Sequence, residues 1–208
     1  MSEHFVNRED PPPGLSSFTR IRLGWIKAEE VAQINPGATA LIFLSPLAKK
    51  EDRLAVRISL SDGQYYLMES RQPIGYDRVL PDFGLVVLKV NPEAQEGYGT
   101  VQMMKANPQA RHFSQATYRL DQETRNCFVD RRNRLAVIPL WKEGDRLGVL
   151  VTTPEIAPKA LDAAVSIQNL LNRHPEPRGK DEERALQESI AFFKRFDFMS
   201  ASERAKKF

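Results

Sequence analysis

The sequence predicts a mainly β fold with C-terminal helices, an α+β protein, on three observations. Up to Thr153 the apolar residues recur in short runs with a period of two, which is the spacing of strands. Clusters of Gly, Pro, Asp and Asn separate these runs, as turns do. After Pro154 the apolar period changes to that of helices. We therefore expect a twisted antiparallel sheet arrangement, either a sandwich or a partly open barrel, followed by a helical pair.

The length and composition indicate one large domain with a modest appendage. The chain has 208 residues, of which 41% are hydrophobic and 27% charged, so it can bury a core and is not disordered over most of its length. We predict an extended N-terminal segment at 1–14, a β-rich domain at 15–154 and a C-terminal helical appendage at 155–208. The prolines at 11–13 make the first segment extended because each ring fixes φ.

The clearest strand places Leu54, Val56, Ile58 and Leu60 on one sheet face, because they alternate with smaller or polar residues. Turn-forming residues follow at 61–64, and the strand pattern resumes at 65–68, so this part of the chain predicts a hairpin. The other predicted strands are residues 38–44, 84–90, 116–120, 126–130, 135–140 and 146–152.

Two helices are predicted after the strands. The first begins at Pro158 and ends near His174. Its apolar face comprises Ala160, Ala163, Ala164, Ile167, Leu170 and Leu171. A linker at 175–179 leads to the second helix, whose acidic first turn at 181–183 suits the positive end of a helix dipole. Its apolar side comprises Leu186, Ile190, Phe193 and Phe196. The two helices are expected to pack on the sheet or on each other, and residues 200–208 to fray.

Charge and hydropathy exclude several classes of protein. The net charge is +3 and the basic residues are spread along the chain, which argues against a nucleic-acid surface. The densest basic cluster, at 131–134, is interpreted as a solvated turn. The longest apolar runs are strand-sized, so no membrane span is predicted. The first ten residues lack the pattern of a secretion signal, and the single cysteine does not decide the compartment, which stays open.

The sequence lacks the motifs of the common hydrolases and nucleotide-binding proteins. Zinc hydrolases with H-E-x-x-H bring two imidazoles to one metal from i and i+4 of a helix. Here the histidines are His4, His112 and His174, far apart, and G-x-S-x-G, G-x-G-x-x-G and P-loop patterns are missing. We therefore predict no catalytic residue, no metal ligand and no cofactor.

Two other groups of residues could have a chemical role, but each has a structural interpretation as well. Cys127 with His112 as its base would make a thiol nucleophile, but the strand-like neighbours of Cys127 favour a small apolar group. The acidic residues of 121–126 together with Asp130 could offer oxygen ligands to calcium, yet they do not fit the twelve-residue loop pattern. A polar hairpin turn is the preferred interpretation.

A charged pair stands out on the strand that begins at Tyr65. Glu69 and Arg71 share a face with Tyr65 and Leu67 if the strand continues, and charges on a partly buried face need partners. The candidates nearby are Asp77 and Arg78. We expect a charge clamp that ties residues 72–81 to the sheet. The alternative is a carboxylate kept for acid or base chemistry, which would line a cleft open to solvent.

The order of motifs resembles one known family. The segments at 15–26, 65–72, 75–77, 80–81 and 84–90 look like the region downstream of the zinc site in secreted metallopeptidases of the immune inhibitor A type, in the gametolysin-like clan. The matching structural positions are Leu23, Gly24, Trp25, Glu69, Arg71, Asp77, Arg78, Leu80 and Pro81. The resemblance implies that these residues hold a β-rich portion together beside a catalytic lobe. The zinc ligands of that family would lie before Leu15, so no catalytic residue is carried over.

This resemblance implies a non-catalytic structural or binding domain. Its expected partner is the catalytic lobe of a parent metallopeptidase, or another protein, and its location is extracellular if the parent follows the family. Two alternatives remain open. One is an independent protein-interaction or adhesion module. The other is an enzyme of unrecognised type that uses Glu69, Arg71 and Asp77.

Overall fold

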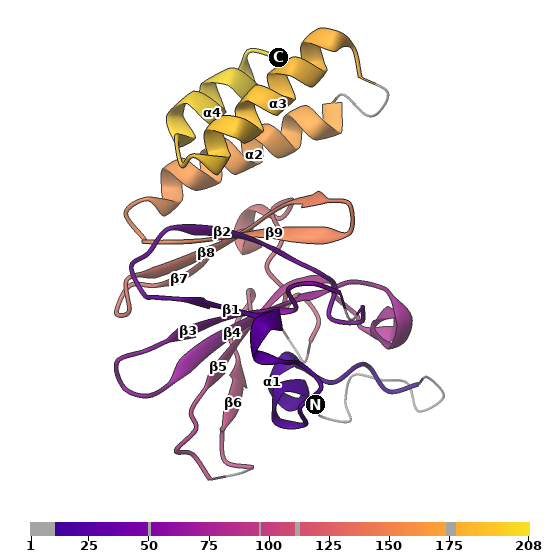
Figure 1. Cartoon of the computed structure of the whole chain (residues 1–208), viewed down its shortest axis with the longest axis vertical. Coiled ribbons are helices and arrows are strands. Elements are labelled where there is room, and N and C mark those ends of the chain that lie inside the picture. The colour runs from indigo at the N-terminus through magenta and orange to yellow at the C-terminus, as the bar shows by residue number, and fades with distance from the viewer. Residues whose placement is uncertain (1–10, 50, 96, 111–112, 174–177) are drawn as a thin grey trace.

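The computed structural model describes residues 11–49, 51–95, 97–110, 113–173 and 178–208, and the predicted α+β fold is confirmed in these ranges. Nine strands of the described residues form two sheets that stack as an open sandwich and do not close into a barrel. Figure 1 shows the layers in sequence: three C-terminal helices, the four-stranded sheet, the five-stranded sheet and a short N-terminal helix.

The five-stranded sheet has the order β1-β3-β4-β5-β6. Its strands are β1 (Val31–Ile34), β3 (Ala55–Ser59), β4 (Tyr65–Arg71), β5 (Gly84–Val90) and β6 (Val101–Met103). Strands β3, β4, β5 and β6 pair antiparallel, but β1 runs parallel to β3, so the sheet is mixed where an antiparallel sheet was expected. The reason is that the chain crosses to the other sheet between these two strands, and such a crossover can return a strand in the same direction.

The four-stranded sheet is antiparallel throughout, in the order β2-β9-β8-β7. Its strands are β2 (Ala40–Leu44), β7 (Phe128–Asp130), β8 (Leu135–Glu143) and β9 (Arg146–Thr152). The predicted strand at 116–120 is wrong. Only an isolated bridge joins Tyr118 to Leu85, because the Asp82 carboxylate accepts the backbone N–H and the hydroxyl of Thr117 at 2.9 Å each.

Several short elements were not predicted from the sequence. Strands β1 and β6 span four and three residues, too few for a period to show. Helix α1 (Ser17–Arg22) lies in the segment that carries the leucine-glycine-tryptophan motif. In the described ranges, three 3-10 helices lie in connections: η2 (Ala28–Glu30), η3 (Gly75–Val79) and η4 (Glu123–Arg125).

The two sheets enclose an apolar core. Its largest fully buried side chains include Leu44, Ile58, Tyr66, Met68 and Leu85. The alternation that predicted the strand around Ile58 is thus the alternation between this core and the opposite face of the five-stranded sheet. Each fully buried side chain of this size contributes roughly 1.5–3 kcal/mol to the free energy of folding.

The C-terminal layer contains three helices where a pair was expected. They are α2 (Ala157–Arg173), α3 (Lys180–Lys194) and α4 (Phe198–Lys206). The expectation that residues 200–208 fray is wrong, because Asp197 caps α4 by accepting from the N–H of Ser200 at 3.1 Å. Lys206 also donates to Asp162 of α2 at 2.8 Å, which holds the last turn of α4 against α2.

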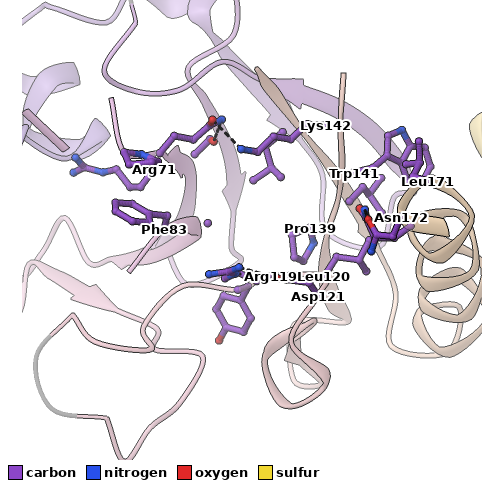
Figure 2. Close-up of a pocket in the computed structure, with 18 residues that line it drawn as sticks. Arg71, Phe83, Arg119, Leu120, Asp121, Pro139, Trp141, Lys142, Leu171 and Asn172 are labelled. Atoms are coloured by element: carbon purple, nitrogen blue, oxygen red, sulfur yellow. Dashed lines mark hydrogen bonds and ion pairs between the residues drawn. The ribbon is translucent and has the colours of Figure 1, made fainter. Parts of the chain in front are cut away.

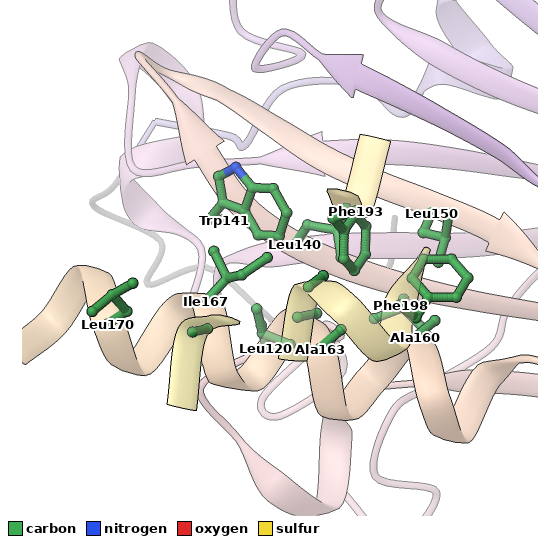
Figure 3. Close-up of a cluster of buried hydrophobic side chains, with 14 of the residues drawn as sticks. Leu120, Leu140, Trp141, Leu150, Ala160, Ala163, Ile167, Leu170, Phe193 and Phe198 are labelled. Atoms are coloured by element: carbon green, nitrogen blue, oxygen red, sulfur yellow. The ribbon is translucent and has the colours of Figure 1, made fainter. Parts of the chain in front are cut away.

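This helical layer packs on the outer face of the four-stranded sheet. Figure 3 shows Trp141 and Leu140 of β8 facing Ile167 of α2, with Phe193 and Phe198 from the other helices beside them. The ring of Phe193 contacts those of Trp141 and Phe198 edge-on, at 5.0 Å between centroids in each case. Helices and sheet therefore share one core. His174 and residues 175–177 of the predicted linker at 175–179 lie outside the described residues.

Candidate functional site

Three charged residues form a buried cluster under helix α1. Strand β4 places Glu69 and Arg71 on the same face, and η3 brings Asp77 to them. The Arg71 Nε donates to the Glu69 Oε1 at 2.8 Å, and the Arg71 Nη1 donates to the Asp77 Oδ1 at 2.6 Å. The predicted pairing of Arg71 with Asp77 is confirmed. Arg78 lies outside the cluster with an exposed side chain, and Glu69 pairs with Arg71 instead.

The electrostatics of the cluster keep Arg71 cationic. Burial by itself would lower the pKa of Arg71, but the charges of Glu69 and Asp77 and their hydrogen bonds raise it above its usual value. A second guanidinium, that of Arg20, lies close by. Burial lowers the pKa of Arg20, and the like charge of Arg71 lowers it further. The two negative charges of Glu69 and Asp77 balance the two positive charges of Arg71 and Arg20.

The cluster also binds the backbone of the N-terminal segment. The Glu69 Oε2 accepts from the N–H of Ser17 at 2.6 Å, and the Asp77 Oδ1 accepts from the N–H of Gly14 at 3.0 Å. The Arg71 Nη1 donates to the carbonyl of Gly14 at 3.0 Å. We expected a clamp on residues 72–81 only. Gly14 and Ser17 were missed because main-chain groups more than fifty positions away leave no signal in the sequence.

The accessibility of the three residues separates the clamp from the catalytic interpretation. The exposed fractions are 1% for Glu69, 2% for Arg71 and 0% for Asp77. A cavity of about 390 Å³ between α1 and strands β5 and β6 reaches Glu69 and Arg71, but their charged groups are occupied by each other and by backbone. A carboxylate for acid or base chemistry should face solvent or substrate. The geometry is that of a clamp.

The leucine-glycine-tryptophan motif ends helix α1. Gly24 has a φ of +70°, the left-handed region that glycine tolerates, and its N–H donates to the carbonyl of Ile21 at 3.0 Å. The N–H of Trp25 then donates to the carbonyl of Arg20 at 2.8 Å. This cap reverses the chain and leaves Leu23 and Trp25 exposed at 52% and 51%.

The other motif pair, Leu80 and Pro81, lies just after the clamp. Leu80 is buried, and its N–H donates to the carbonyl of Asp77 at 3.0 Å, which closes η3. Pro81 is exposed, and its lack of an N–H suits the end of a 3-10 helix. Both residues therefore position the segment that carries Asp77.

Helix α1 covers part of an apolar surface on the five-stranded sheet. Phe18 and Ile21 of α1 pack against a buried cluster that contains Val86 and Leu88 of β5 and whose margin stays partly exposed. We call the exposed part the α1 face. It consists of exposed Leu15, Leu23 and Trp25 and partly buried Phe18, Ile21, Val101 and Met103. Isolated exposed apolar residues are ordinary, whereas contiguous groups of them are typical of contact surfaces.

A second cavity, of about 620 Å³, lies between the ends of β4, β5 and β8 and the side of α2 (Figure 2). On one wall the Lys142 Nζ donates to the Gln72 Oε1 at 3.0 Å, and on another Arg119 pairs with Asp121 at 2.6 Å. Leu171 and other residues of α2 complete the lining. The hydroxyl of Ser70, one of the lining residues, accepts from the side-chain amide of Gln72 at 3.4 Å.

Cys127 is placed as a small apolar residue. Burial raises the pKa of its thiol to about 11, so the neutral form dominates at physiological pH. His112, the base considered for it, lies outside the described residues, as do His4 and His174. Within the described part of the chain, His, Cys, Asp and Glu side chains form no group of three that could hold a metal ion.

Two of the carboxylates considered as calcium ligands, those of Asp121 and Asp130, accept hydrogen bonds from other side chains. Asp121 accepts from Arg119, and this bond lowers the pKa of Asp121. Asp130 accepts from the hydroxyl of Tyr66 at 2.7 Å and from Asn133 at 2.6 Å. These carboxylates stabilise the turns before and after β7.

The fold and the site together define an α+β sandwich with a helical layer on one sheet and a buried charge clamp under the other. Comparisons with models of protein families, with curated proteins and with solved structures found no match for this chain. None of the helices in the described ranges has the length and apolar character that a bilayer crossing requires.

Proposed function

We propose that this chain is a non-catalytic domain that binds a protein through the α1 face, as a β-rich support beside the catalytic lobe of an immune inhibitor A type metallopeptidase. The observation that carries the proposal is the clamp. Glu69, Arg71 and Asp77 hold the backbone of Gly14 and Ser17, directly beside the exposed residues of the α1 face. In the resembled family the catalytic lobe precedes this part of the chain.

The physical properties of the α1 face fit a protein partner. Leu23 and Trp25 are half exposed on a hydrogen-bonded cap, and aromatic residues such as Trp25 supply contact area at a small cost in side-chain entropy. Arg22, over the ring of Phe18 at 5.6 Å, adds a positive charge at the rim. The clamp fixes the helix in one position, so that less conformational entropy is lost on binding.

Binding is tested with the separately expressed catalytic lobe of an immune inhibitor A type metallopeptidase, by isothermal titration calorimetry. We expect saturable binding that the Trp25→Ser variant weakens by about tenfold or more, the effect of losing a central aromatic contact. Met199→Ser is the matched control, because Met199 is exposed at 56% on α4, in the helical layer at the other end of the molecule (Figure 1). No binding, or equal weakening by both variants, would contradict the proposal.

The non-catalytic part of the proposal has its own measurement. The purified chain with stoichiometric zinc and casein as substrate should release no peptides over the background of a zinc-free sample. Proteolysis that requires zinc and stops on addition of a chelator would show that the chain is itself a peptidase.

The two competing functions differ in what they require. An enzyme that uses Glu69, Arg71 and Asp77 needs these groups at a solvent-filled cleft, which their burial and mutual pairing disfavour. An independent interaction module predicts no binding to the catalytic lobe. The same calorimetric titration therefore separates that module from the support domain.

A further inference from the structure

Two edge strands leave one side of the sandwich open. Strand β1 is the first of the five-stranded sheet and β2 the first of the four-stranded sheet, and Figure 1 shows them one above the other on the side nearest the viewer. A hollow of about 450 Å³ lies between them. It is lined by Ala32, Gln33 and Ile34 of β1, by residues 40–43 of β2, and by Asp52, Arg53 and Arg146.

The backbone of β2 presents hydrogen-bonding groups on this side that are unpaired within the described residues. Just after β2, the N–H of Ser45 points away from β9 and donates to the carbonyl of Arg53 at 2.8 Å. Successive residues of a strand present their N–H and C=O groups in alternating directions. The groups of Leu41 and Phe43 therefore also point away from β9. In the described part of the chain neither residue has a backbone hydrogen bond outside the sheet ladder.

The residues of β2 themselves offer no protection to this edge, and the nearest cations, Arg146 and Lys194, lie over the ring of Phe43 at 5.9 and 5.6 Å. Ala40–Leu44 reads Ala-Leu-Ile-Phe-Leu, with neither a charge nor a proline, and its first four residues are partly exposed. Proteins usually guard an edge strand with charges, prolines, bulges or a covering loop, because an apolar free edge is a template for another strand. Ile42 of β2 and Ile34 of β1 border the inter-sheet core and are available to side chains from such a strand.

The edge is complementary to itself. If β2 pairs antiparallel with β2 of a second copy, with the twofold axis at Ile42, then Leu41 of each copy lies opposite Phe43 of the other. These are the residues whose N–H and C=O groups are free, so they exchange reciprocal backbone hydrogen bonds. The ion pair between Arg146 and Asp52, at 3.3 Å, lies at the Leu44 end of the strand only.

In the antiparallel arrangement this charged end of one copy lies beside the small residues Ala38 and Thr39 of the other. The charges of the Arg146–Asp52 pair in the two copies then do not face each other, whereas a parallel arrangement would bring them together, and Lys194, which lies over Phe43, is itself paired with Glu143 at 2.8 Å. We propose that the free edge of β2 is a homodimerisation site, at which β2 strands of two copies join the four-stranded sheets into one continuous sheet. This site is separate from the α1 face and does not rest on the function proposed above.

Sedimentation equilibrium of the full chain over a wide range of protein concentration tests this proposal. We expect the average mass to rise with concentration from 23.7 kDa towards twice that value. Leu41→Pro removes the free N–H, and Leu41→Ala removes the same side chain but keeps the N–H. The proline variant should raise the dissociation constant by about tenfold or more, the equivalent of at least 1.4 kcal/mol, and by much more than the alanine variant does.

Circular dichroism checks that both variants fold. Hydrogen exchange of the unaltered chain provides an independent readout, in which the amides of Leu41 and Phe43 should exchange more slowly in concentrated than in dilute samples. A chain that stays monomeric at every concentration overturns the proposal. So does a folded proline variant that dimerises like its alanine counterpart. If the proline variant does not fold, hydrogen exchange of the unaltered chain decides. Exchange rates at the amides of Leu41 and Phe43 that do not change with protein concentration would then overturn the proposal.

Discussion

Replacing Glu69 by alanine should destabilise the protein strongly, because it removes one carboxylate from a buried ionic cluster. Arg71 is 2% exposed and would keep only Asp77 as a charged partner. Breaking a buried ion pair by removing one partner costs about 3–5 kcal/mol. The N–H of Ser17 would lose its acceptor as well, a cost of roughly 1–3 kcal/mol that overlaps with the first because the N-terminal segment can relax.

We therefore expect the free energy of unfolding to fall by about 3–5 kcal/mol. For a chain of this size, that loss corresponds to a decrease in Tm of roughly 6–20 °C. Urea denaturation followed by circular dichroism measures the first quantity, and calorimetry the second. Glu188→Ala is the control, because Glu188 pairs with Arg184 and Arg204 on the helix surface, and its denaturation midpoint should equal that of the unaltered chain. A loss below about 1 kcal/mol, the range of exposed pairs, would refute the clamp.

Three further outcomes follow from local geometry. Gly84→Ala should lower the free energy of unfolding measured by urea denaturation. The new Cβ would lie 2.6 Å from the carbonyl oxygen of Tyr118, and the φ of Gly84, +148°, is one that residues with a side chain rarely adopt. Unchanged stability would mean that the backbone around Tyr118 moves away from the new Cβ. Cys127 should react with iodoacetamide at pH 8 far more slowly than in urea-unfolded protein, because burial raises the pKa of its thiol to about 11; equal rates measured by mass spectrometry would show an accessible thiolate. Burial tends to raise the pKa of Asp130, but hydrogen bonds from Asn133 and Tyr66 lower it below the usual value of an aspartate. The stabilisation from the ionised carboxylate is therefore present above the pKa of an aspartate in the unfolded chain, about 3.9, and is lost as the pH falls through the lowered pKa, so the difference in stability between the unaltered chain and Asp130→Asn should shrink below that pH.

Much of the architecture could be predicted because it rests on local periodicity. The alternation around Ile58 and the helical spacing from Ala160 to Leu170 reflect faces that the structure buries. The predictions failed where contacts distant in sequence decided the outcome. Asp82 takes the backbone N–H of Thr117, which prevents a regular strand there.

The candidate site, too, could be predicted only in part. The sequence identified Glu69, Arg71 and Asp77 because charges on an otherwise apolar strand face need partners. It did not indicate that the clamp holds the backbone of Gly14 and Ser17, since every residue type carries the N–H and C=O groups that these contacts use.

By itself, the sequence determined the class of fold, the location of the helices at the C-terminal end of the chain and the charged residues of the clamp, because periodicity and the cost of burying charge act over a few neighbouring residues. Only the tertiary structure decided which sheet each strand joined and which edge remained open. Strand order depends on how the chain crosses between the two sheets, so β1 and β2, adjacent in sequence, became the free edges of different sheets.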